Sequence, residues 1–196
     1  MPSLNLSLVQ SEVHFMESMT AEIHYIDIST FAGTIVSHSS LLTNMASIST
    51  RAGTIRGRYT LGEKLSLTST AGGIDVDVLV NTNISSPKAR LLTRSSAGST
   101  QVNLLSPLKH RNQITAQHRS SAGSMTLVYP QEWEGVVEAK TSAGSLRLSG
   151  EGLEIVESRG EFGPNRYEKG VKGDDWENKC KVDIYSSAGS CSFTLE

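Results

Sequence analysis

Apolar and polar residues alternate with a period of two along most of this chain, on both sides of a recurring Ala-Gly pair. Seven and five positions before each glycine, and two and four positions after it, the residues are mostly apolar. In the first copy, Ile26 and Ile28 precede Gly33, and Ile35 follows it. This pattern is typical of a half-buried strand, a tight turn and a second half-buried strand. No helical spacing is sustained, so the sequence predicts an all-β protein.

The Ala-Gly pair forms a repeat that runs through the chain. Its glycines are Gly33, Gly53, Gly72, Gly98, Gly123, Gly144 and Gly189. Successive glycines are 19 to 26 residues apart, except for the last interval of 45 residues, which is close to twice the others. We therefore place a degenerate eighth turn at Gly160, with Leu153 and Ile155 before it and Phe162 after it.

A single repeat of this length cannot bury its own apolar face, whereas stacked repeats bury a continuous core. The sequence thus predicts a single-domain parallel β-solenoid of about eight coils with Ala-Gly corners. Glycine at each corner would supply a positive φ or a close backbone approach. An antiparallel sandwich with a hairpin at each Ala-Gly pair is the alternative, but it does not require the same small residue at every corner.

The two ends of such a stack leave open sheet edges that must be covered. Residues 1–24 are less regular and apolar enough for an N-terminal cap, and residues 25–196 would form the solenoid, with an irregular charged loop at 157–179. We expect that loop to cover the C-terminal edge, where Cys191, Phe193 and Leu195 alternate on one face. If the loop swings away, this edge is a candidate surface for weak homo-oligomerisation or partner binding.

The segment 65–78, LSLTSTAGGIDVDV, resembles the repeat of the auto-transporter adhesin head family, a bacterial family of domains of unknown function. Residues 142–157 and 166–173 are similar to its fungal adhesin-like members, and the resemblance extends over residues 20–196. The Ala-Gly corners depart from the Ser-Gly that is more usual in that family. The resemblance implies a β-solenoid fold and a cell-surface or extracellular location, and it implies no catalytic residues or cofactor.

Composition narrows the choice of function. The chain has 196 residues, a net charge of −2 and a pI near 6.2, which argues against a nucleic-acid-binding protein. It contains 29 Ser and 16 Thr, and its 37% of hydrophobic residues in clean alternation argues against disorder. The sequence contains no run of 18 apolar residues, so we predict no membrane-spanning helix. The first residues show no signal-peptide pattern.

Few residues suggest chemistry. His118 occupies an inward position, with Thr93 and Ala139 as its predicted neighbours, and we expect a buried polar pair with Thr93 rather than a functional histidine. Asp75 and Asp77 share an outward face beside Arg56 and Gln101, and a solvated surface is the favoured interpretation. We therefore predict no catalytic, cofactor-binding or metal-binding residues.

Two cysteines and one tryptophan leave alternatives open. Cys180 and Cys191 both lie at inward positions of the last coil. They either form a disulfide across that coil or remain two buried thiols. Trp133 lies in a loop at 129–135, where it either forms part of a sugar-binding surface or folds over the edge of a coil.

These observations favour a non-catalytic, adhesin-like or structural interaction module with a protein or cell-surface glycan as partner. One alternative is a polysaccharide-active enzyme of the parallel β-helix type, which needs an acid cluster with a cation in one groove. The other is an ice-binding protein, which needs a flat hydroxyl array. Arg94, Arg119 and Lys140 interrupt such an array.

Overall fold

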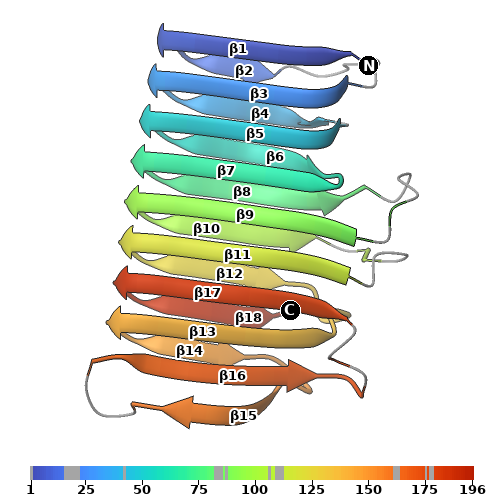
Figure 1. Ribbon diagram of the computed structural model, residues 1–196, viewed down its shortest axis with the longest axis vertical. Helices are drawn as coiled ribbons and strands as arrows, with labels where there is room; N and C mark the ends of the chain where they lie inside the picture. The colour runs from blue at the N-terminus through green and yellow to red at the C-terminus, as the bar shows by residue number, and fades with distance from the viewer. Residues whose placement is uncertain are drawn as a thin grey trace.

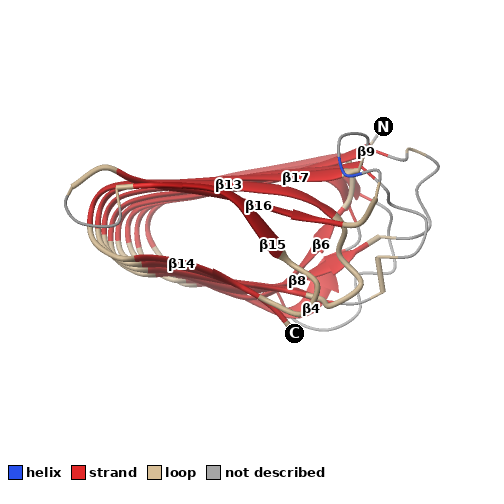
Figure 2. Ribbon diagram, turned by 90° about the horizontal axis from the view of Figure 1, so that it is seen from below, coloured by secondary structure: helices blue, strands red, loops and turns tan. Residues whose placement is uncertain are grey.

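The part of the chain that the structure describes is all-β with almost no helix. The computed structural model describes residues 2–15, 23–41, 43–81, 86, 88–105, 107–108, 113–160, 164–174, 176 and 179–196. Their strands form two sheets that lie face to face, as Figure 1 and Figure 2 show from perpendicular directions. Almost all pairs are parallel, and the exceptions among the described strands involve β16.

The strand order within each sheet follows the stacking of the repeats. The ten-stranded sheet contains, in spatial order, β1 (Ser3–Gln10), β3 (Ile23–Ala32), β5 (Thr43–Ala52), β7 (Lys64–Ala71), β9 (Lys88–Ala97), β11 (Gln113–Ala122), β17 (Cys180–Ala188), β13 (Gly135–Ala143), β16 (Arg166–Lys172) and β15 (Glu154–Arg159). The eight-stranded sheet contains β14 (Leu146–Ser149), β18 (Cys191–Leu195), β12 (Met125–Tyr129), β10 (Thr100–Leu105), β8 (Ile74–Val80), β6 (Ile55–Leu61), β4 (Ile35–Leu41) and β2 (Val13–Phe15).

The inward positions predicted from the alternation form the core between the sheets. Leu65 on β7 pairs with Leu91 on β9, which in turn pairs with Ala116 on β11, and all three are buried. Because side chains alternate between the two faces of a strand, every second residue points into this core. The largest fully buried side chains are Trp133, Tyr59, Tyr129 and Phe193.

Each Ala-Gly pair is a corner where the chain leaves one sheet and enters the other. Gly123 has φ +132°, and a Cβ atom there would lie 2.1 Å from the carbonyl oxygen of Gly98 in the neighbouring corner. The corners are also joined by hydrogen bonds, such as the 2.8 Å bond that Gly72 N–H donates to the carbonyl of Ala97. Only glycine fits this combination of positive φ and close backbone approach.

The strand order corrects the prediction for the C-terminal end. β17 lies between β11 and β13, and β18 lies between β12 and β14, so the last strand pair is inserted into the stack. The corner bonds follow the same order, since Gly123 N–H donates to Ala188 and Gly189 N–H donates to Ala143. β18 therefore has neighbours on both sides and is not the open edge that we expected to support homo-oligomerisation.

The predicted eighth turn at Gly160 is also wrong. Strands β15 and β16 both belong to the ten-stranded sheet and pair antiparallel, and β16 pairs antiparallel with β13. Gly160 lies after β15 and before this return, with φ +78°, and the predicted Phe162 lies outside the described residues. β16 pairs with the edge of β13 that faces away from β11. The other edge of β13 pairs with β17.

The N-terminal segment adds one strand at the end of each sheet. β1 pairs in parallel with β3, and β2 pairs in parallel with β4. Ser11 takes the corner position between them, and its N–H donates to the carbonyl of Ala32 as the glycines do at other corners. The alternation predicts this strand pair less clearly because Ser11 replaces the corner glycine.

Candidate functional site

The outward side of β7, β9 and β11 gathers positive charge. Five exposed cations occupy outward positions on these three adjacent strands, and we call them the basic face: Lys64, Lys88, Arg90, Arg94 and Arg119. The remaining outward positions of the three strands hold serine, threonine, glutamine and one leucine, and no carboxylate. In a chain whose net charge is −2, this separation of charge marks a candidate anion-binding surface.

Strand register brings these cations together from distant parts of the sequence. Lys64 on β7 pairs with Arg90 on β9, and Arg94 on β9 pairs with Arg119 on β11. Neighbouring strands lie about 4.8 Å apart, so each pair places two positive charges side by side. Across the described residues, no carboxylate lies within ion-pair distance of Lys64, Arg90, Arg94 or Arg119.

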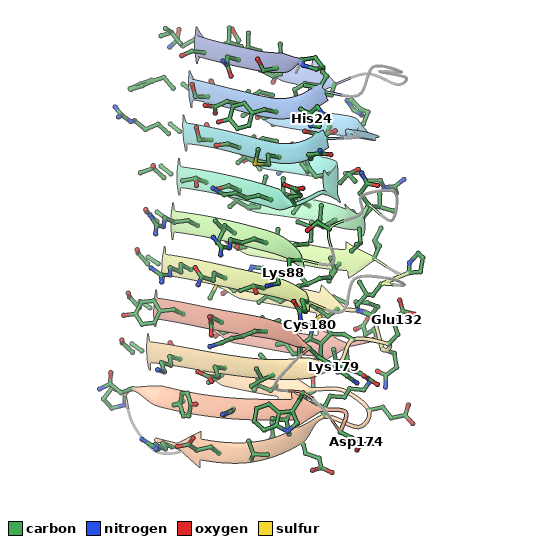
Figure 3. The ribbon with its side chains drawn as sticks, turned by 45° about the vertical axis from the view of Figure 1, so that its right-hand side comes forward. His24, Lys88, Glu132, Asp174, Lys179 and Cys180 are labelled. Atoms are coloured by element: carbon green, nitrogen blue, oxygen red, sulfur yellow. The ribbon has the colours of Figure 1, made fainter. Side chains whose placement is uncertain are left out.

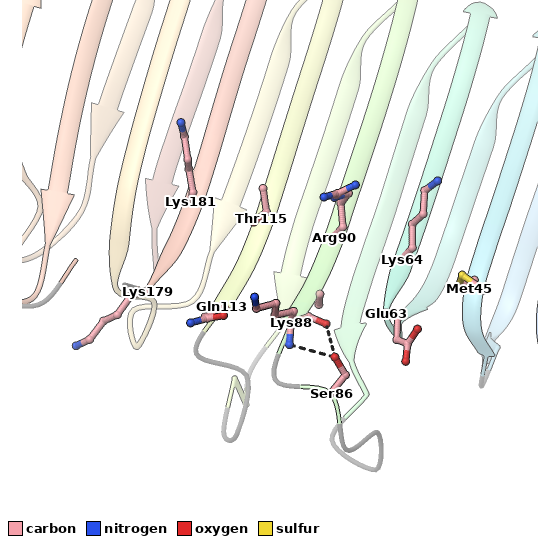
Figure 4. Close-up of a pocket in the computed structure, with 11 residues that line it drawn as sticks. Met45, Glu63, Lys64, Ser86, Lys88, Arg90, Gln113, Thr115, Lys179 and Lys181 are labelled. Atoms are coloured by element: carbon pink, nitrogen blue, oxygen red, sulfur yellow. Dashed lines mark hydrogen bonds between the residues drawn. The ribbon is translucent and has the colours of Figure 1, made fainter. Parts of the chain in front are cut away.

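An open groove of about 720 Å³ crosses the face where these strands begin. Lys64, Lys88 and Arg90 line it together with Lys179 and Lys181. Figure 3 places Lys88 and Lys179 on this side of the molecule, and Figure 4 shows Lys64, Arg90, Thr115 and Lys181 in a row across successive strands.

Acidic residues partly offset the positive charge of this groove. Glu63 is the only acid among the lining residues. Lys179 forms an ion pair with Glu134, and Lys181 forms one with Asp183 at 3.2 Å. Partial burial lowers the pKa of Lys181, but the hydrogen bond to Asp183 and nearby negative charges outweigh this effect and raise it overall. The lysine therefore remains a cation.

A second groove of about 240 Å³ continues the surface along the same strands. Arg94 and Arg119 line it with Ser66, Thr68 and Gln117. The planar guanidinium groups of Arg can each hold a carboxylate or sulfate through two parallel hydrogen bonds. The hydroxyl and amide groups around them can donate and accept hydrogen bonds, so this surface suits a ligand that carries both anions and hydroxyls.

The sequence identified part of this surface. Arg94 and Arg119 were recognised as outward cations, but Lys140 does not lie beside Arg119, because β17 intervenes and brings Tyr185 to that place. Lys64 and Arg90 each lie eight residues before a corner glycine, as Thr115 and Lys181 do. A comparison of this outward position between repeats would have found them.

His118 is part of a buried polar network and does not reach the basic face. Its Nδ1 lies 2.8 Å from the Thr93 hydroxyl, and its Nε2 lies 2.9 Å from the Tyr129 hydroxyl. Burial lowers the pKa of His118 to about 3, so the ring is neutral at ordinary pH. Its other neighbour along the sheet is Ile184 and not the expected Ala139, because β17 is inserted there. A fully buried, hydrogen-bonded imidazole serves the structure of the core.

The residues that we expected on an interaction surface lie in the core instead. Trp133, Cys191, Phe193 and Leu195 are 0%, 2%, 0% and 5% exposed. The ring of Trp133 packs edge-on against Tyr129 and Phe193, at centroid distances of 6.3 and 5.6 Å. Packing against these aromatic rings removes the Trp133 side chain from any surface that a sugar could reach.

The two cysteines are buried and form no disulfide. Cys180 begins β17, whereas Cys191 begins β18 after the corner at the other end of β17. Eight residues of extended strand span roughly 26 Å, far beyond the reach of a disulfide. Of the two arrangements left open by the sequence, the structure has the buried thiols.

The acids Asp75 and Asp77 lie on the outward side of β8, far from the basic face. Asp75 pairs with Arg56 and Gln101 as predicted. Asp77 accepts a 3.1 Å hydrogen bond from Asn103. Within the described residues, no group of three or more potential metal ligands is found.

Comparison with known proteins gives a family without a function. The family described as "Domain of unknown function (DUF7330)" matches residues 60–166, which include β7, β9 and β11. No curated protein and no solved structure matches the chain. In the described part of the chain, no helix is long and apolar enough to cross a membrane. Because the match covers more than half of its residues, the chain belongs to the DUF7330 family of domains of unknown function.

Proposed function

We propose that this protein is a non-catalytic, adhesin-like interaction module in which a β-solenoid of about eight coils presents a binding surface. Support for the solenoid comes from the strand pairs joined at corners, of which the described residues contain eight if the Ser11 corner is included. Every inner strand of such a stack is hydrogen-bonded on both sides. The outward side chains are therefore held on a rigid platform, which reduces the ordering cost of binding.

The observation that carries the proposal is the basic face. Four of its five exposed cations, Lys64, Arg90, Arg94 and Arg119, form no ion pair with a carboxylate among the residues that the structure describes. They leave positive charge for a partner to neutralise. A face that served only solubility would more often mix both signs of charge. The surface fits recognition of an extended anionic partner through many separate contacts.

A polysaccharide-active enzyme would require a different arrangement. Glycoside hydrolysis generally needs two carboxylates that face each other across the bond to be cleaved. Glu63 is the one carboxylate among the residues that line the larger groove, whereas Asp75 and Asp77 lie on the other sheet. An ice-binding surface would require a flat hydroxyl array, and Arg94 and Arg119 project from the middle of the strands that would form it.

The proposal is tested by binding and product analysis on one panel of polysaccharides and synthetic polyanions. We expect the protein to bind at least one of these polymers and to release no shortened product. The double variant Arg94→Glu, Arg119→Glu should lose that binding. The double variant Arg56→Glu, Arg147→Glu changes the charge equally on the other sheet and should retain it. Steady release of cleaved polymer would overturn the proposal, as would equal binding by both variants.

A further inference from the structure

We infer that the partner of the basic face is a linear acidic polysaccharide that carries a carboxylate or sulfate group on its repeating sugars. This inference rests on the proposed function and specifies the chemistry of its ligand. It follows from three features of the surface: the spacing of the cations, the polar side chains around them, and the side chains that the surface does not contain.

The cations recur in two directions. Along β9, Lys88, Arg90 and Arg94 share one face over a distance of roughly 20 Å. Across the strands, Lys64 lies beside Arg90, and Arg119 lies beside Arg94. Two cation pairs joined along one strand fit an extended polymer with charges at regular intervals better than a single small anion.

Hydroxyl and amide side chains lie around these pairs, and Leu92 separates Arg90 from Arg94 along β9. Ser66, Thr68 and Gln117 line the second groove, and Thr115 lines the first. Sugars present hydroxyl groups between their charged groups, and these side chains can form hydrogen bonds with them. A polymer that carries anions but no hydroxyl groups would leave these hydroxyl and amide side chains without hydrogen-bond partners on the ligand.

Other polyanions fit the surface less well. Single-stranded nucleic acids are generally held by several aromatic rings that stack on successive bases. The outward positions of β7, β9 and β11 contain no aromatic residue, and Tyr185 beside Arg119 supplies a single ring. An acidic peptide cannot join the sheet here, because each of these strands already pairs with a neighbour on both sides. An anionic membrane would favour apolar side chains among the cations, and the outward positions of these three strands offer only the half-buried Leu92.

The test measures binding of the full chain to polygalacturonate, with the carboxyl-reduced neutral polymer as the matched ligand. We expect binding to polygalacturonate that weakens as salt rises, and no measurable binding to the reduced polymer. The triple variant Arg90→Gln, Arg94→Gln, Arg119→Gln should bind about tenfold more weakly, because each exposed ion pair contributes a factor of a few. The double variant Arg56→Gln, Arg147→Gln should bind as the parent protein does.

Competition separates this inference from the proposed function. Poly-L-glutamate, duplex DNA and phosphatidylserine vesicles are added at equal charge, and we expect each to displace polygalacturonate poorly. Displacement by any of them as effectively as by free polygalacturonate would overturn the polysaccharide assignment and leave the interaction module standing. Binding to a neutral polymer only would likewise overturn the assignment to an acidic polysaccharide and leave the interaction module standing. Cleavage of polygalacturonate would overturn the proposed function itself.

Discussion

The Thr93 hydroxyl and Nδ1 of His118 are 2.8 Å apart in the fully buried core, on adjacent strands of the ten-stranded sheet. The hydroxyl of Tyr129 lies 2.9 Å from Nε2, the other ring nitrogen of His118. One ring nitrogen of a neutral imidazole donates and the other accepts, so both hydroxyl contacts are satisfied without a charge. The core thus tolerates a histidine at an otherwise apolar position only while that histidine remains neutral.

This network makes stability depend on pH. The pKa of His118 is about 3 in the folded protein and near 6.5 in an unfolded chain, so the unfolded state binds the extra proton between these values. Stability contributed by the neutral ring is complete above pH 6.5 and is lost as pH falls toward 3. The loss from this group approaches about 1.4 kcal/mol per pH unit within that window.

Urea unfolding of the parent protein and of His118→Gln between pH 4.5 and 7.5 measures this dependence. We expect the free energy of unfolding of the variant to fall less steeply on acidification. Gln101→Ala, which changes an exposed side chain without an ionisable group, should keep the slope of the parent. Identical slopes for parent and His118→Gln would show that His118 does not titrate as described.

The corner glycines should be intolerant of side chains. In Gly123→Val, a β-branched residue would have to adopt φ +132° with its Cβ 2.1 Å from the Gly98 carbonyl oxygen. We expect a loss of roughly 3 kcal/mol or more in thermal or urea unfolding. The control is Gly73→Ser, because its nearest contact would be 3.2 Å and other corners carry Ser or Thr at this place. A melting temperature of Gly123→Val within a degree or two of the parent would refute the corner geometry.

The inserted position of β18 gives Phe193 a larger role than a terminal strand would. Phe193 is fully buried and pairs with Leu127 on one side and Leu148 on the other. We expect Phe193→Ala to cost about 3–5 kcal/mol of unfolding free energy, as truncation of a buried aromatic residue generally does.

The matched control for Phe193→Ala is Val156→Ala on the edge strand β15, where Val156 is 54% exposed. It should change stability by less than about 0.5 kcal/mol. If the two substitutions have similar small effects, β18 does not hold β12 and β14 together.

The thiols should resist modification in the folded protein. Burial raises the pKa values of Cys180 and Cys191, which disfavours the reactive thiolate of each. We expect a disulfide-exchange reagent to label both cysteines slowly in native buffer and rapidly in urea. Prolonged air oxidation should leave the mass of the monomer unchanged, because no intramolecular disulfide forms. Rapid native labelling of both residues would contradict their burial.

Local physics explains what could be predicted from the sequence. Alternation assigns Leu65, Leu91 and Ala116 to the core, because a strand sends successive side chains to opposite faces whatever its neighbour is. The Ala-Gly pairs predict the corners because glycine tolerates a positive φ and a close backbone approach whatever its neighbours are. His118 and Thr93 could be paired because their repeats are adjacent both in the sequence and in the sheet.

Only the tertiary structure decided the order of the last strand pairs and the extent of the basic face. The corners have nearly identical backbones, so β11 could accept either β13 or β17 as its parallel neighbour by hydrogen bonding alone. The antiparallel β16 occupies the far side of β13, and β17 and β18 then fill the space beside β11 and β12. Charges such as those of Lys64 and Arg90 come together because strand register joins residues that are distant in the chain. Periodicity within one repeat determines which way a side chain points, but it does not determine which repeat lies next to it.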